Sequence, residues 1–308
     1  MRELIRRRRP CRALVHHNMR PIEGLPVERV SGDVMDPVSL ERAFQGAEVV
    51  YHLAARISLI GGQDGLVHDT NVVGTRNVVA ACLAAGVRRL VHFSSIHAFQ
   101  QRPFDEPLDE TREKSGDEAP AYDRSKALAE REVLAGVERG LDAVIVNPTG
   151  VLGPFDFEPS AMGQVLLDLH HRRLAGLVAG GFNWVDVRDV INGALAAEAR
   201  GRTGQNYLLG GHWVSVVEVA ETVRQVTGVA PPWFVSPMWL ARVGAPFAVA
   251  FAKVRGTRPL FTSDSLAALR SNRAISFEKA TRELGYSPRP FRETIQDSFA
   301  WFREMGWV

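Results

Sequence analysis

The strongest constraint on the fold is a regular alternation of short apolar runs with helical segments through the first half of the chain. The runs have the length of strands and end at small residues, Gly, Pro or Asn, and the segments between them have helical spacing. Strands that alternate with helices form a parallel sheet with helices on both faces. The sequence therefore predicts an α/β fold built on a doubly wound parallel sheet.

The predicted strands of this first half cover residues 11–15, 27–30, 48–55, 88–94 and 141–147. The predicted helices cover residues 38–44, 71–85 and 122–137. Ligands of such sheets bind beyond the carboxyl ends of the strands. Candidate site residues are therefore sought just after each strand.

The second half is less regular and predicts a smaller lobe that covers the ligand site. Its predicted helices lie near 161–169, 185–199, 216–226, 263–269 and 277–284, with a strand at 207–209. We expect a sheet domain formed by residues 1–150 and joined by 183–210. The second lobe is expected to comprise residues 151–182 and 211–308.

Composition excludes several classes of protein. The chain has 308 residues, of which 45% are hydrophobic and 23% charged, and a net charge of +2, which gives no argument for a nucleic-acid partner. Two cysteines cannot form a disulfide framework or a zinc site, and paired histidines at 16–17 and 170–171 lack partners at metal-ligand spacing. The best apolar run, 243–252, is too short to span a bilayer and contains Pro246. We expect a cytoplasmic protein with no metal site and no membrane span.

One group of residues in the sequence suggests a catalytic site. The segment AYDRSKALAE places Tyr122 and Lys126 four residues apart, on one face of a predicted helix. An ammonium beside a phenol lowers the pKa of the phenol, which suits a general acid or base. Ser94 and Ser95 end a predicted strand, where a hydroxyl could bind the same substrate oxygen. The Tyr–Lys spacing alone is common on surface helices, but together with a serine at a strand end it predicts a catalytic site.

Seven segments in order resemble the extended short-chain dehydrogenases/reductases, also called the NAD-dependent epimerase/dehydratase family. They are GDVMDP from residue 32, HLAA from 52, NVVGT from 71, HFSSIHAF from 92, YDRSK from 122, NPTGVLGP from 147 and NWVDVRDV from 183. Each is weak alone, but seven in the right order are a strong signal, and the resemblance extends over nearly the whole chain. The resemblance implies a Rossmann-like dinucleotide-binding domain (1–150 joined by 183–210) and a substrate-binding lobe.

The resemblance also implies roles for individual residues. Tyr122 would protonate a carbonyl oxygen, Ser95 would hydrogen-bond it, and Lys126 would tune Tyr122 and bind the nicotinamide ribose, while the cofactor carries the hydride. The implied cofactor-binding residues are His16, Asp33, Val34, Leu53, Ala54, Ala55, Asn71, Lys126, Pro148 and Thr149. Members that prefer NAD often have an acidic residue after the second strand, whereas this chain has His16-His17-Asn18, which slightly favours NADP over NAD.

Within the family, the chain is most similar to the dihydroflavonol-reductase-like and 3β-hydroxysteroid-dehydrogenase-like branch. Residues 180–183 contain no arginine for a diphosphate, and the second lobe is rich in apolar residues. This predicts an NAD(P)-dependent oxidoreductase acting on a small hydrophobic carbonyl or alcohol. An NAD-dependent sugar-nucleotide epimerase or dehydratase is the alternative enzyme. Members of the family often form homodimers, and the resemblance implies that the helices 71–85 and 122–137 would form the dimer face here.

The first residues depart from the family pattern. Members begin with a strand and a G-x-x-G-x-x-G turn that holds the pyrophosphate, whereas residues 1–5 resemble the second half of the first helix and the first glycine is Gly24. The unmatched part is about 20 residues, and its strand is the middle one of the family's sheet, so two strand edges would be unpaired. Three interpretations stay open. The start lies upstream of Met1, which the intact Tyr122–Lys126 motif favours; or the protein is a truncated, cofactor-deficient, non-catalytic relative; or another segment or chain completes the sheet.

Overall fold

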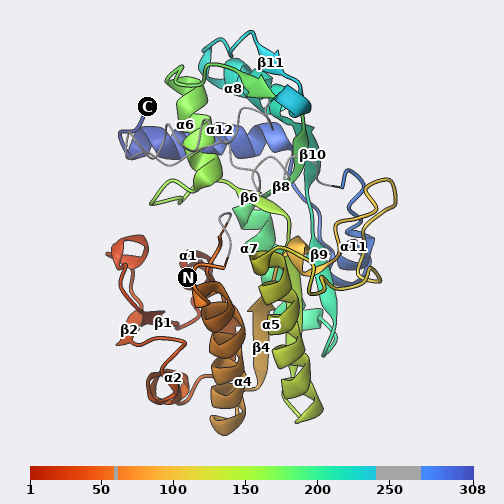
Figure 1. Cartoon of the computed structure of the whole chain (residues 1–308). Coiled ribbons are helices and arrows are strands. Elements are labelled where there is room, and N and C mark those ends of the chain that lie inside the picture. The colour runs from red at the N-terminus through yellow and green to blue at the C-terminus, as the bar shows by residue number, and fades with distance from the viewer. Residues whose placement is uncertain (59–61, 241–271) are drawn as a thin grey trace.

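The predicted parallel sheet is present in the computed structural model, which describes residues 1–58, 62–240 and 272–308 (Figure 1). Its four strands run in the order β3-β4-β5-β9, and every neighbouring pair is parallel. The strands are β3 (Val49–His52), β4 (Arg89–Phe93), β5 (Ala143–Pro148) and β9 (Asn206–Leu209). The apolar run 243–252 and the predicted helix 263–269 lie outside the described residues.

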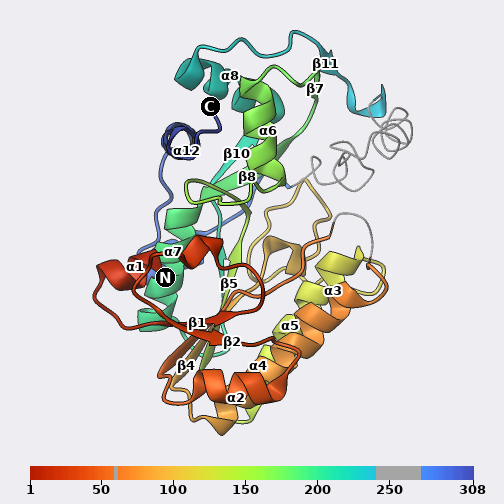
Figure 2. The ribbon, with the colours of Figure 1, turned by 90° about the vertical axis from the view of Figure 1, so that its left-hand side faces the viewer.

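A second parallel pair, β1 (Arg12–Val15) and β2 (Glu28–Ser31), forms a separate two-stranded sheet (Figure 2). Within the described part of the chain, β1 is paired only with β2 and β3 only with β4. The sheet is therefore divided between β1 and β3. This is the place where the family pattern has one more strand.

Helices cover both faces of the four-stranded sheet. On one face, Leu90 and Ile145 pack with residues of α2 (Pro37–Phe44), α4 (Gly74–Ala84) and α5 (Ala121–Glu138). On the other face, Val91 and Val144 pack with α7 (Val187–Arg200) and α11 (Glu278–Leu284). Successive strand residues are thus buried on opposite faces, which explains the nearly continuous apolar runs in the sequence.

The second lobe lies at one end of the molecule (Figure 1). It contains a three-stranded sheet of β6 (Gly150–Leu152), β8 (Gly181–Asp186) and β10 (His212–Ser215), and a pair of β7 (Leu177–Val178) with β11 (Val235–Ser236). Its helices are α6 (Ala161–His170), α8 (Val216–Thr227) and α12 (Phe291–Glu304). Their apolar faces share one core, which includes Leu166, Val219 and Phe299.

Several element boundaries differ from the predictions. The strand predicted to run to residue 55 ends at His52, and the helix predicted from Asn71 begins earlier, with α3 (Leu66–His68) and a π-helical stretch (Asp69–Val73) before α4. Pro148 lies within β5 rather than after it, paired with Leu209. The predictions also missed α12 entirely. The helix expected over residues 1–5 is present as α1 (Arg2–Arg6), and two short 3₁₀ turns cover Arg20–Ile22 and Ile96–Ala98.

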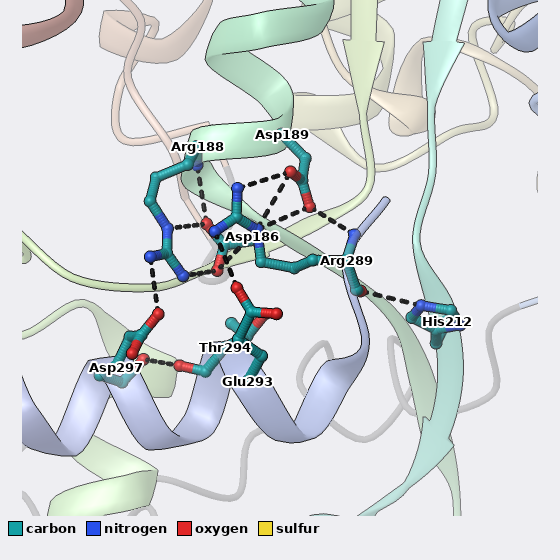
Figure 3. A network of polar contacts seen from close by, with 9 residues as sticks. Asp186, Arg188, Asp189, His212, Arg289, Glu293, Thr294 and Asp297 are labelled. Atoms are coloured by element: carbon teal, nitrogen blue, oxygen red, sulfur yellow. Dashed lines mark hydrogen bonds and ion pairs between the residues drawn. The ribbon is translucent and has the colours of Figure 1, made fainter. Parts of the chain in front are cut away.

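A buried polar cluster connects the sheet domain to α12 (Figure 3). Asp186, at the end of β8, accepts hydrogen bonds from the backbone and guanidinium of Arg188, and Arg188 also pairs with Asp297 of α12 at 2.6 Å. Arg289, just before α12, contacts Asp189 at 2.9 Å and donates its backbone N–H to the same carboxylate at 2.8 Å. The signature NWVDVRDV therefore supplies the carboxylates that hold α12 in place.

Among the described residues, no helix combines the length and apolarity needed to cross a membrane. In the same part of the chain, no group of three or more His, Cys, Asp or Glu side chains is arranged to hold a metal ion.

Candidate functional site

The structure brings Tyr122, Ser95 and Lys126 together at the carboxyl end of β4. Tyr122 and Lys126 lie in the first turns of α5, and Ser95 follows β4 directly. A side-chain hydrogen bond joins Ser95 to the Tyr122 hydroxyl. Lys126 is buried, and its Nζ donates to the carbonyl oxygen of Phe93 at 2.9 Å. The candidate catalytic residues thus occupy the edge of the sheet where ligands of this fold bind.

The protonation of these groups differs from the expectation in one respect. Burial raises the pKa of Tyr122, and the hydrogen bond from Ser95 opposes that rise only in part. Burial, and not the Lys126 charge, therefore sets the direction of the Tyr122 pKa, in contrast to the prediction. Burial lowers the pKa of Lys126 to about 8, against the opposing effect of the Glu130 charge. At neutral pH, Tyr122 is therefore protonated and suited to donate a proton.

Two buried histidines lie beside Lys126. His52 of β3 and His92 of β4 are neighbours in register, with ring centroids 5.2 Å apart. The Nε2 of His52 is 2.9 Å from Thr75 Oγ1, whereas neither ring nitrogen of His92 has a hydrogen-bond partner among the described residues. Burial and, secondarily, the Lys126 charge lower the pKa of His52 to about 3 and the pKa of His92 well below its usual value. Both rings are therefore neutral at pH 7.

Replacing His92 with leucine is expected to make the protein more resistant to acid. The lowered pKa of His92 means that the unfolded state takes up its proton first as the pH falls below about 6.5, so stability is lost in that range. His92→Leu removes this term, and it also removes two unsatisfied buried nitrogens. Urea unfolding should be measured for both proteins at pH 7 and at pH 5. Between these two pH values, the free energy of unfolding of His92→Leu should fall by about 2 kcal/mol less than that of the wild type. An equal loss in both proteins would contradict the prediction.

Asn71 forms three hydrogen bonds beside the candidate catalytic residues. Its Oδ1 accepts from the backbone N–H of Arg56 at 2.7 Å, and its Nδ2 donates to the Arg56 carbonyl at 3.0 Å and to Ser125 Oγ at 2.9 Å. These contacts tie the segment after β3 to the first turn of α5. Asn71 therefore fixes the backbone around the candidate catalytic residues.

The residues expected to contact the adenosine end of a dinucleotide lie at the ends of β1 and β2. His16 Nε2 is 3.0 Å from Asp33 Oδ2, so the structure joins two residues that the sequence placed far apart. Both side chains remain partly exposed to solvent. Val34 differs, because it is buried against Gly74, where an added Cβ would lie 2.8 Å from its side chain. Val34 therefore shapes the helix packing rather than presenting its side chain at the surface.

The residues expected near the nicotinamide end carry free polar atoms. Ser94 Oγ and Thr149 Oγ1 are buried at the ends of β4 and β5 and have no hydrogen-bond partner among the described residues. Pro148, before Thr149, is partly exposed, and Leu53, Ala54 and Ala55 are exposed directly after β3. These groups fit a bound ligand at this edge of the sheet.

The fit to a dinucleotide is thus partial. Side chains are in place for its adenosine and nicotinamide ends, but the sequence contains no G-x-x-G-x-x-G pattern of the kind that holds a pyrophosphate. The cofactor-binding residues named above are those that would hold the two ends. No contact to the pyrophosphate can be assigned within the described residues.

Sequence reasoning missed two pairs of residues that touch this site. His97 Nδ1 lies 3.3 Å from the carboxylate of Asp123, and the His97 ring packs edge-on to Tyr122 at 5.9 Å. Asn147 donates to the carbonyl of Ser95 at 3.0 Å and to the buried carboxylate of Glu130 at 2.6 Å. Glu130 was the one with a signal in the sequence, since it follows Lys126 by four residues on the same helix.

Comparisons with known proteins identify the family and the fold. Residues 3–210 match the model of the NAD dependent epimerase/dehydratase family. The "Sterol demethylase protein B" of Methylococcus capsulatus is 34% identical over 100% of this chain and 95% of its own length. The "Putative dihydroflavonol 4-reductase" of Synechocystis is 31% identical over 100% of this chain and 92% of its own length. The crystal structure of gox2253 superimposes with a TM-score of 0.85 and 35% identity, covering 100% of this chain and 94% of that one.

Proposed function

The chain belongs to the NAD-dependent epimerase/dehydratase family, and we propose that it is an NAD(P)-dependent oxidoreductase that interconverts a carbonyl and a secondary alcohol. The observation that carries this proposal is the protonated Tyr122, hydrogen-bonded to Ser95 and one helical turn from Lys126. A protonated phenol and a serine hydroxyl converging at one point form a site for a single substrate oxygen.

The proposed roles of Tyr122, Ser95 and Lys126 follow from their positions. In reduction, the Tyr122 hydroxyl donates its proton to the carbonyl oxygen, and Ser95 Oγ hydrogen-bonds that same oxygen. The nicotinamide, when bound, supplies the hydride. Lys126 would turn from the Phe93 carbonyl to the nicotinamide ribose, and its charge there would stabilise the phenolate left on Tyr122. In oxidation, the same groups act in reverse.

The substrate class is proposed to be small and hydrophobic. Residues 180–183 place no arginine near the site for a diphosphate, and the second lobe presents partly buried Met162 and Phe182 beside its core. A relative named for sterol demethylation and another named for dihydroflavonol reduction support an apolar carbonyl compound. Trp184 is buried in the core of the lobe and is therefore a packing residue.

A binding and turnover assay tests the proposal. We expect NADPH to quench tryptophan fluorescence with a lower Kd than NADH, because His16, His17 and Asn18 contain no acidic group to repel a 2′-phosphate. With bound cofactor, oxidation of NADPH should depend on an added ketone from a panel of aliphatic, aromatic and steroid carbonyl compounds. Turnover of UDP-glucose without net cofactor oxidation would support the epimerase alternative. Absence of cofactor binding would reject the oxidoreductase and favour a non-catalytic relative.

A further inference from the structure

The carboxylate of Glu130 is almost completely buried below the candidate site. It lies on α5, one turn beyond Lys126, and is 1% exposed. Its oxygens accept hydrogen bonds from Asn147 Nδ2 at 2.6 Å and from Asn206 Nδ2 at 3.0 Å, and they pair with Lys114 Nζ at 2.5 Å. A buried carboxylate is costly unless its charge and lone pairs are satisfied, and here three groups from separate parts of the chain satisfy it.

One branch of this cluster reaches Ser95. Asn147 donates its second amide hydrogen to the Ser95 carbonyl at 3.0 Å, while its Oδ1 accepts from Asn206 at 2.9 Å. The Asn147 amide therefore has three hydrogen-bond partners: Ser95, Glu130 and Asn206. Asn206 is itself hydrogen-bonded to Glu130. The Ser95 backbone is therefore connected to Glu130 through this amide, while Ser95 Oγ accepts from the His97 backbone N–H at 3.2 Å.

The other branch acts on Lys126. The titratable groups around Lys126 are His52 on β3, His92 on β4, and Tyr122 and Glu130 on its own helix. Both histidines are neutral at pH 7, and Tyr122 is protonated, so Glu130 is the anion among these four. Lys114 balances Glu130 from the far side, where its ammonium also lies 3.4 Å from the ring centroid of Phe99.

We propose that Glu130 is a positioning residue that holds Lys126 charged and, through Asn147, holds Ser95 in place. The proposal rests on the proposed function only in giving Lys126 and Ser95 their part in catalysis. Glu130 itself contacts neither substrate nor cofactor. It links the two groups that flank Tyr122, so that a single buried charge supports both.

The charge of Lys126 can be measured without any activity. The chain has four lysines, so protein labelled with ¹³C-lysine gives few side-chain signals, and Lys126→Arg assigns the relevant one. The Lys126 pKa of about 8 should fall by about one pH unit in Glu130→Gln, because the anion one helical turn away is lost while burial remains. Glu132→Gln is the matched control, since Glu132 lies on the same helix but pairs with Arg76 at the surface. Its Lys126 pKa should equal that of the wild type.

A double variant separates this effect from misfolding. Glu130→Gln alone leaves Lys114 buried without its partner, whereas Lys114→Met with Glu130→Gln removes both charges. The Lys126 pKa should fall in the double variant as well. An unchanged Lys126 pKa in folded Glu130→Gln and in the double variant would overturn the proposal. If the wild type proves to reduce no carbonyl compound and the pKa still falls, the oxidoreductase is rejected while the role of Glu130 on Lys126 stands.

Discussion

Replacement of Tyr122 with phenylalanine should lower kcat/KM for carbonyl reduction by about 10²- to 10⁴-fold, the usual contribution of a positioned general acid. The variant keeps the ring and its packing against His97 and removes only the hydroxyl that is hydrogen-bonded to Ser95. The loss should therefore appear in kcat, with cofactor binding by fluorescence titration and the thermal unfolding midpoint close to wild type. A Tyr122→Phe enzyme with wild-type kcat would exclude Tyr122 as the proton donor.

Two comparisons sharpen this result. Ser95→Ala removes one of the two proposed hydrogen bonds to the substrate oxygen. It should lower kcat/KM less than Tyr122→Phe does, because the proton donor remains.

The pH dependence of activity should be dominated by Lys126, since burial raises the pKa of Tyr122 and lowers the pKa of Lys126 to about 8. Activity is therefore expected to decline above about pH 8, as the ammonium loses its proton, well before Tyr122 ionises. An activity that rises steadily to pH 10 would show that the Lys126 charge is not required.

The sequence predicted which residues meet at the site because one rule governs parallel sheets. The carboxyl ends of neighbouring strands share an edge, so Ser95 after β4 and Thr149 after β5 had to lie near each other. Helical spacing then placed Tyr122 and Lys126 on one face of α5. Both patterns can be seen in short stretches of sequence. The same kind of pattern also predicted the strands of the sheet and most of its helices.

The sequence does not predict the contacts that depend on long-range packing. That Lys126 donates to the Phe93 carbonyl, and that burial raises the pKa of Tyr122, both depend on how α5 lies on β4. That Asn147 meets both Ser95 and Asn206 depends on the register of β5 against its two neighbours. For α12, a signal was present, since Ile295, Phe299 and Phe302 repeat at helical spacing after Pro290.

The largest loss of stability is expected from Arg289→Met, in the polar cluster that connects β8 and α7 to α12 (Figure 3). Asp189 is 5% exposed and depends on the Arg289 guanidinium, which also lies 3.7 Å from the Asp186 carboxylate. Removing one partner of a buried ion pair leaves an uncompensated charge, at a cost of about 3–5 kcal/mol. Urea unfolding monitored by tryptophan fluorescence measures this loss.

Two controls make the interpretation of Arg289→Met specific. Arg292→Met changes an exposed arginine of the same region, the second residue of α12, and should alter the free energy of unfolding by less than about 0.5 kcal/mol. Asp189→Asn combined with Arg289→Met removes both members of the pair, so no buried charge is left alone and part of the stability should return. If the double variant is as unstable as Arg289→Met, the loss comes from missing packing around the arginine side chain. If it recovers, the charge of Asp189 is what makes Arg289 necessary, and the signature NWVDVRDV owes its second aspartate to the docking of the C-terminal helix.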